Sequence, residues 1–71
     1  MKLHYYADTD SLYIELNGRP SADSREIADG FVVDFDAQGN VVGLDFNQAS
    51  KKLDLASLEA ESLPATRVRI G

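Results

Sequence analysis

The stretch Phe31–Phe46, FVVDFDAQGNVVGLDF, contains the pattern that decides the predicted fold. Apolar and polar residues alternate over residues 31–36 and again over residues 41–46, as they do in strands that bury one face. Gly39 or Asn40, between the two runs, can adopt the left-handed backbone conformation that a tight loop often needs. The stretch therefore predicts an antiparallel hairpin.

The register of this hairpin follows from the side chains that it brings together. With Asp36 opposite Val41, three cross-strand pairs of large apolar residues share one face, and such pairs stabilise sheets. The predicted pairs are Phe35 with Val42, Val33 with Leu44 and Phe31 with Phe46. Asp34, Asp36 and Asp45 then lie on the opposite face, where Asp34 faces Gly43.

A second hairpin is predicted at the N-terminal end. Residues 11–17 alternate strictly, residues 2–7 alternate more weakly, and Asp8–Ser11 has the composition of a turn. A connecting loop of two or four residues puts the apolar residues of both strands on one face, which a loop of three would not do. The predicted pairs are Ala7 with Leu12, Tyr5 with Ile14 and Leu3 with Leu16.

Two further segments complete the predicted sheet and a helical region. Residues 23–28 form a short strand before the turn at Asp29-Gly30. After Phe46 the apolar period becomes helical, which predicts a helical segment over residues 48–62. Asp54 could cap a second short helix and divide that segment in two. Residues 66–70 alternate again and are a possible strand.

The predicted fold class is α+β, in one domain of residues 1–71. We expect an antiparallel β-meander of four to five strands, packed on one face by the C-terminal helical segment. The predicted strands cover residues about 2–7, 11–17, 23–28, 31–36 and 41–46.

Composition restricts the classes of function. Twelve acidic and seven basic residues give a net charge of −5, which makes nucleic acid a poor partner. The charge is uneven, because residues 1–46 hold nine acids and three bases. Cysteine is absent, and no apolar run or N-terminal leader pattern indicates a membrane span or secretion. We therefore expect a cytoplasmic protein that has neither a membrane nor a nucleic-acid partner.

No residue type is present in a pattern that assigns catalysis or cofactor binding. His4 is the only histidine, and on the strand prediction it points away from the apolar face. Asp34, Asp36 and Asp45 cluster on the polar face, and such carboxylates can bind Mg²⁺ or Ca²⁺ or divide into an acid and a base. A metal-dependent or acid/base hydrolase is therefore an alternative, although we assign no catalytic, cofactor-binding or metal residue.

The favoured hypothesis is a protein-interaction module without enzymatic activity. Its predicted interaction surface consists of Asp34, Asp36, Asp45, Tyr6 and Tyr13, because carboxylates attract a basic partner and tyrosines suit interfaces. A homodimer is a further alternative, since so small a core gains from association. The predicted partner is thus a basic protein or a second copy of the chain, with no cofactor.

A series of short motifs runs along the chain from Tyr5-Tyr6 through Gly30–Asp36 to Ala49-Ser50. Their order resembles a bacterial family known as domain of unknown function 2283. The resemblance covers residues 5–50 and departs from the family at Asp29, where the family usually has proline before the glycine. It implies no catalytic or binding residue, and the occurrence of such proteins beside toxin-like proteins suggests an antitoxin-like role. The matching pieces are Tyr5-Tyr6, Asp10–Ile14, Glu26-Ile27, Gly30–Asp36, Gly39, Val42–Phe46 and Ala49-Ser50.

Overall fold

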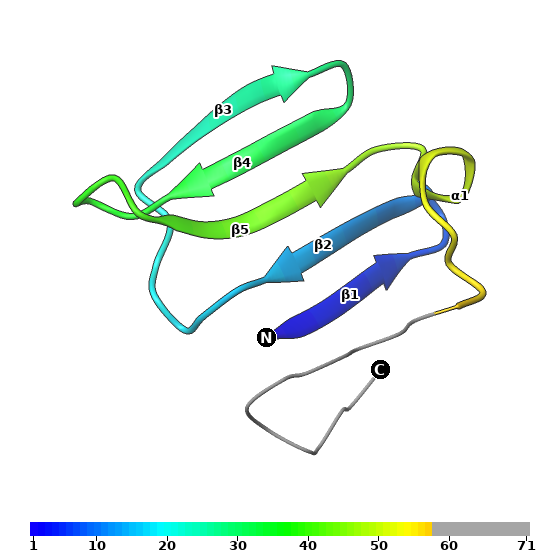
Figure 1. Ribbon diagram of the computed structural model, residues 1–71, viewed down its shortest axis with the longest axis horizontal. Coiled ribbons are helices and arrows are strands. Elements are labelled where there is room, and N and C mark those ends of the chain that lie inside the picture. The colour runs from blue at the N-terminus through cyan, green and yellow to red at the C-terminus, as the bar shows by residue number, and fades with distance from the viewer. Residues whose placement is uncertain (58–71) are drawn as a thin grey trace.

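The computed structural model describes residues 1–57, which form a five-stranded antiparallel sheet and one short helix (Figure 1). The strands are β1 (Lys2–Tyr6), β2 (Ser11–Glu15), β3 (Asp23–Ala28), β4 (Phe31–Phe35) and β5 (Val41–Phe46), and the helix is α1 (Ala49–Lys52). Alternation of apolar and polar residues is clear in β2, β4 and β5, weaker in β1 and poor in β3. Within the described residues, no helix is long and apolar enough to cross a membrane.

The strand order is β1-β2-β5-β4-β3, so the predicted meander is wrong. The β1–β2 hairpin is joined to a β3–β4–β5 meander by pairing of β2 with β5. Residues 16–22 therefore cross from one half of the sheet to its far edge. This crossover extends the ladders at both ends, since Leu16 N–H donates to the Val42 carbonyl (3.0 Å) and Ala22 N–H to the Phe35 carbonyl (2.8 Å).

Burial explains why β3 lies at the edge and β5 in the centre. All six residues of β3 are exposed, whereas β5 contains buried Val42 and pairs with apolar residues on both sides. On the β2 side, Leu12 lies opposite Phe46 and Ile14 opposite Leu44. A strand with the sequence DSREIA would bury charge in a central position, and buried unpaired charge is costly.

The register of β4 with β5 follows the prediction except at one end. Phe31 pairs with Phe46 and Val33 with Leu44, and the two phenyl rings stack with centroids 4.7 Å apart. The predicted pairing of Phe35 with Val42 is wrong, because a β-bulge places Phe35 opposite Val41. The bulge adds one residue to β5 next to the turn around Asp36.

The β1–β2 hairpin has a loop of four residues, and its register differs by two from the prediction. Leu3 pairs with Ile14 and Tyr5 with Leu12. A shift of two residues keeps the same side chains on the same face. The loop, whose four residues fit the predicted length of two or four, ends at Asp10, where φ is left-handed at 52°. Asp residues tolerate this conformation better than most.

Alternation divides the sheet into two faces, which we call the apolar face and the open face. The apolar face includes Leu12 and Val33, which are 6% and 7% exposed. The open face is polar. The apolar face consists of Leu3, Tyr5, Leu12, Ile14, Phe31, Val33, Leu44 and Phe46, and the open face of Lys2, His4, Tyr6, Ser11, Tyr13, Glu15, Ser24, Glu26, Val32, Asp34, Gly43 and Asp45.

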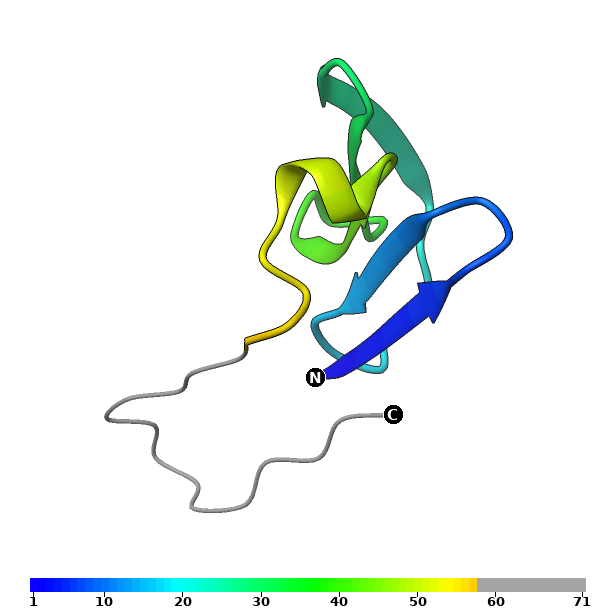
Figure 2. The ribbon, with the colours of Figure 1, turned by 90° about the vertical axis from the view of Figure 1, so that its right-hand side faces the viewer.

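The helix α1 is much shorter than the predicted helical segment of residues 48–62. It ends after Lys52, because Leu53 adopts an extended backbone conformation. The Asp54 carboxylate accepts a hydrogen bond from Ala56 N–H (3.2 Å), and whether a second helix follows it stays a prediction. Figure 2 shows α1 to one side of the sheet. Residues 58–62 and the possible strand at 66–70 lie outside the described residues.

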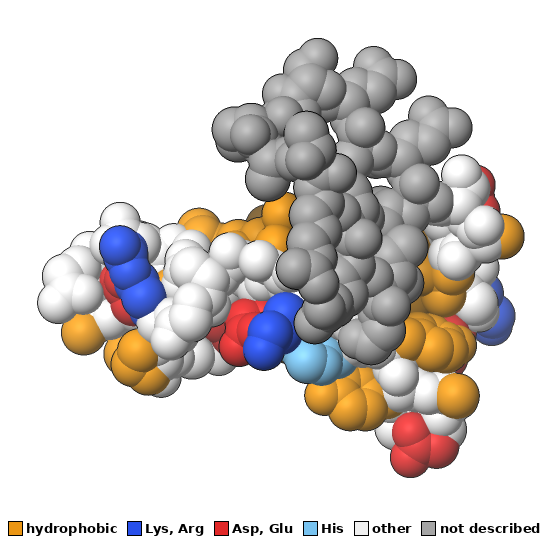
Figure 3. All heavy atoms as spheres, turned by 90° about the horizontal axis from the view of Figure 1, so that it is seen from below, with side chains coloured by type: hydrophobic (Ala, Val, Ile, Leu, Met, Phe, Trp, Pro, Cys, Tyr) orange, Lys and Arg blue, Asp and Glu red, His pale blue; other side chains and the backbone are white. Residues whose placement is uncertain are grey.

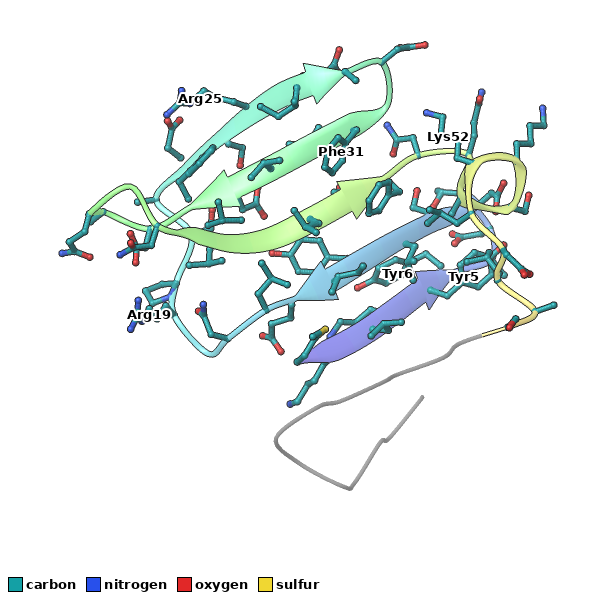
Figure 4. The ribbon with its side chains drawn as sticks, in the orientation of Figure 1. Tyr5, Tyr6, Arg19, Arg25, Phe31 and Lys52 are labelled. Atoms are coloured by element: carbon teal, nitrogen blue, oxygen red, sulfur yellow. The ribbon has the colours of Figure 1, made fainter. Side chains whose placement is uncertain are left out.

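Hydrogen bonds attach α1 to two turns at one end of the sheet. On one side, Ala49 N–H donates to the carbonyl of Asp10 (2.8 Å). On the other, the Lys52 ammonium donates to the carbonyl of Asp29 (2.8 Å), beside Gly30 (Figure 4). The helix thus joins the β1–β2 turn to the β3–β4 turn, although these turns are distant in sequence.

Candidate protein-binding surface

The open face is organised around Asp34 of β4. Its carboxylate accepts hydrogen bonds from the Tyr13 hydroxyl (2.9 Å) and from the Ser24 hydroxyl (2.6 Å). Tyr13 comes from β2 and Ser24 from β3, so these two bonds reach across the sheet. Together they fix the side chain that the sequence places at the centre of the acidic face.

Tyr13 reaches Asp34 only because β5, which lies between their strands, has a glycine at the crossing point. A Cβ atom built at Gly43 would overlap the Tyr13 hydroxyl oxygen and would lie 2.6 Å from the ring carbon that carries it. Any side chain at this position would displace the tyrosine. A glycine inside a strand often marks such a close approach, so Gly43 was a readable signal for the crossing.

The surroundings of Tyr13 are electronegative. Its burial and its hydrogen bond to Asp34 raise the pKa of the Tyr13 hydroxyl to about 12, and the charges of Asp34, Glu15 and Asp45 act in the same direction. The hydroxyl therefore remains a hydrogen-bond donor at all ordinary pH values. The ring of His4 lies beside it, with centroids 6.5 Å apart.

Four carboxylates occupy the open face, one on each of four strands. They are Glu15 on β2, Asp45 on β5, Asp34 on β4 and Glu26 on β3. The ion pairs formed among residues 1–57 join Arg19 to Asp36 and Arg25 to Asp23, so none involves these four carboxylates. Lys2, on the edge strand β1 opposite Glu15, is the only lysine or arginine of the open face. The face thus presents net negative charge.

Asp36 does not belong to this face, although the sequence places it there. It is 7% exposed and lies in the β4–β5 turn. Its carboxylate accepts hydrogen bonds from the backbone N–H groups of Gln38 (2.9 Å) and Asn40 (2.8 Å), and Arg19 lies 3.7 Å away. The bonds from Asn40, with those from Gln38 and the charge of Arg19, lower the pKa of Asp36. The residue stabilises a turn and offers little surface to a partner.

The predicted tyrosines occupy different environments. Tyr6 is 52% exposed at the end of β1, on the open face (Figure 4). Tyr13 is half-buried, and its hydroxyl is engaged by Asp34. Viewed from below Figure 1, basic, acidic, histidine and apolar side chains lie next to one another on the surface (Figure 3). Of the predicted surface residues, the structure thus brings Asp34, Asp45, Tyr6 and Tyr13 onto one face.

A second polar cluster, which the sequence did not indicate, lies where α1 meets the β1–β2 turn. The Asp10 carboxylate accepts hydrogen bonds from the Tyr5 hydroxyl (2.7 Å), the Ser50 hydroxyl (2.7 Å) and Ser50 N–H (3.1 Å). The bonds from Ser50 and Tyr5 lower the pKa of Asp10. From the sequence, Asp10 is only a turn residue, because its partner Ser50 lies forty positions away.

Within residues 1–57, no three His, Asp or Glu side chains are placed to hold a metal ion. Asp36 lies beside a hollow of about 280 Å³, between residues 19–22 and the β4–β5 turn. The carboxylate there is already paired with Arg19 and the turn. The hydrolase alternative gains no support from this arrangement.

A known family model matches the region of the chain that contains all five strands, their turns and Gly43. That model is the one described as protein of unknown function, DUF2283, and it matches residues 2–50. The chain belongs to the DUF2283 family. No curated protein and no solved structure matches the chain. The resemblance inferred from the sequence is therefore confirmed, and it supplies no activity.

Proposed function

We propose that this DUF2283 protein is a binding module that captures a positively charged segment of another protein on its open face. The observation that carries the proposal is the set of four carboxylates on neighbouring strands, with no ion pair to any of them from residues 1–57. Facing charges of opposite sign guide association and select the partner.

The shape and composition of the face support the same function. Helix α1 is bound to turns at the end of the sheet, which leaves the open face free of it. Tyr6 and His4 contribute apolar surface with polar tips beside the carboxylates, a combination favoured at interfaces. An arginine-containing segment can pair with the carboxylates and stack on such rings. Neutralisation of a basic toxin, the antitoxin-like role, would be one use of this binding.

The test compares two variants that change the net charge equally. Asp45→Lys reverses a charge on the open face, and Asp8→Lys reverses an exposed charge in the β1–β2 turn. The probe is a fluorescent nona-arginine peptide, with affinity measured by anisotropy over a series of salt concentrations. We expect Asp45→Lys to weaken binding by about tenfold, and Asp8→Lys by much less. Equal weakening by both variants would show attraction by net charge alone and contradict the proposal.

A capture experiment extends the test to natural partners. Protein immobilised through its C-terminus is incubated with a lysate of its source, and captured proteins are compared between the original chain and Glu15→Lys/Asp45→Lys. The proposal predicts a basic protein that binds the original chain and is lost with the variant. A captured protein that binds both equally uses another surface.

A further inference from the structure

The two edges of the sheet differ in a way that predicts a second interaction surface. Within residues 1–57, β1 and β3 each pair with a strand on one side only (Figure 1). Among residues 1–57, no strand pairs with their outer backbone N–H and C=O groups, and such an edge is a potential site of association.

The β3 edge carries the devices that prevent such pairing. Asp23, Arg25 and Glu26 place charge along the strand, and its register shifts between Glu26 and Ala28. Charged side chains and β-bulges are common means by which edge strands avoid pairing with other chains. The β3 edge is thus a poor docking strand, even though Ile27 is 58% exposed.

The β1 edge has fewer of these devices. Its register with β2 is regular over the whole strand, and Lys2 is its only lysine or arginine. Tyr5 and Tyr6 are 49% and 52% exposed, on opposite faces of the sheet. Tyrosine is enriched at protein interfaces because it adds apolar area with little loss of conformational entropy.

The backbone groups that point outward from β1 can be identified from the ladder. Leu16 N–H donates to the Val42 carbonyl, so the even-numbered residues of β2 face β5 and the odd-numbered ones face β1. These odd-numbered residues of β2 pair with the even-numbered residues of β1, whose backbone N–H and C=O groups therefore face β2. Because direction alternates along an antiparallel strand, the N–H and C=O groups of Leu3 and Tyr5 point outward.

We propose that the β1 edge pairs in an antiparallel manner with the β1 edge of a second copy of this chain, forming one continuous sheet. A two-fold axis beside His4 places Leu3 opposite Tyr5 of the second copy, where both have outward N–H and C=O groups. Both of these side chains belong to the apolar face, and Lys2 lies opposite Tyr6 of the second copy on the open face. The contact brings no two lysines and no two carboxylates opposite each other. A two-fold contact of this kind forms a closed dimer and does not add further copies.

The first test measures association by sedimentation equilibrium over a range of protein concentrations. Tyr5→Lys places charge at the proposed contact, and the new ammonium can still reach Asp10, the present partner of the Tyr5 hydroxyl. The matched control is Ile27→Lys, which makes an exposed apolar residue of the other edge into lysine. We expect Tyr5→Lys to raise the dimer dissociation constant by about tenfold or more, and Ile27→Lys to leave it unchanged. An original chain that stays monomeric at millimolar concentration, or equal effects of both variants, would overturn the proposal.

A second test does not depend on the stability of Tyr5→Lys. The chain has no cysteine, so His4→Cys introduces a single thiol beside the proposed two-fold axis. There the two copies of residue 4 would form a non-hydrogen-bonded pair with Cα atoms about 4.5 Å apart, close enough for a disulfide. Under mild oxidation we expect rapid dimer formation by His4→Cys and slow formation by Glu26→Cys on β3. Equal rates would overturn the proposal. The carboxylates of the open face lie on β2, β5, β4 and β3 and not at the β1 contact, so Asp45→Lys should dimerise normally whether or not the open face binds a partner.

Discussion

The apolar face and the open face are built from the same five strands, yet different forces stabilise them. The apolar face contains Leu12 and Val33, which are almost fully buried, and the stacked rings of Phe31 and Phe46. The open face contains hydrogen bonds that cross strands and carboxylates without ion pairs from the described residues. Folding and binding should therefore respond to substitutions on different faces.

The strongest effect on folding should come from the apolar face. Leu12→Ala removes a buried side chain, which costs about 2–4 kcal/mol of the free energy of unfolding. A domain of this size is stabilised by only about 3–5 kcal/mol, so the variant should be largely unfolded. Circular dichroism during urea titration gives the measurement. A midpoint unchanged from that of the original chain would contradict this prediction, because the apolar face would then not be the source of stability.

Substitution of Gly43 on the open face should also weaken folding. Gly43→Ala places a methyl group against the Tyr13 hydroxyl, and we expect a loss of about 1–3 kcal/mol. The clash disappears when Tyr13 is also removed. Gly43→Ala/Tyr13→Ala should therefore be no less stable than Tyr13→Ala alone, by urea denaturation. Simple addition of the two losses would show that Tyr13 does not cross β5 at Gly43.

Removal of the Tyr13 hydroxyl should have a smaller effect. Tyr13→Phe loses the hydrogen bond to Asp34, which contributes about 1–2 kcal/mol, whereas Tyr6→Phe, at an exposed position, should be neutral. Folding raises the pKa of Tyr13 from 10.0 to about 12. Its contribution is thus present below pH 10 and lost as the pH rises toward 12. Ultraviolet titration of phenolate should show a late step that Tyr13→Phe lacks; an unchanged titration would contradict the assignment.

The hydrogen bonds between Asp10 and α1 predict that stability falls at acid pH, whereas the contribution of Tyr13 is lost at alkaline pH. The Asp10 pKa is lowered from 3.8 in the folded state, so its contribution is present above that value and is lost as the pH falls through the lower folded pKa. The melting temperature should therefore fall at acid pH, and Asp10→Asn should reduce this fall. The pKa of Asp36 is also lowered, so the part of the acid destabilisation that comes from Asp36 should remain in that variant. An acid profile unchanged by Asp10→Asn would show that Asp10 does not hold α1.

The smallest effect on folding belongs to the residue with the largest predicted effect on binding. Asp45→Lys changes a half-buried carboxylate that makes no ion pair with residues 1–57, and its stability should stay within about 0.5 kcal/mol of the original. Urea denaturation measures this value on the sample used for peptide binding. A large loss of stability would show that the open face serves folding rather than recognition.

The sequence predicts the strands and the central pairs because alternation depends on burial of one face. Phe31 with Phe46 and Val33 with Leu44 follow from that rule alone. The strand order does not, because pairing of consecutive strands is only a tendency. The polarity of residues 23–28 was the available sign that β3 lies at an edge.

The polar contacts were less accessible to sequence reasoning, since they depend on distances between remote residues. Asp36 shares the alternation of β4, but its carboxylate turns toward backbone N–H groups of the following loop. Asp10 and Ser50 meet only because α1 returns to the β1–β2 turn. Asp34 and Asp45, in contrast, are placed on the open face by register alone.

The most direct test of the central claim is a nuclear magnetic resonance titration of the ¹⁵N-labelled chain with the nona-arginine peptide. The account predicts that the largest shift changes fall on the open-face residues of β2, β5 and β4, around Glu15, Asp45 and Asp34, and that they disappear in Glu15→Lys/Asp45→Lys. Changes that follow exposed charge throughout the chain, or that centre on the apolar face, would contradict it.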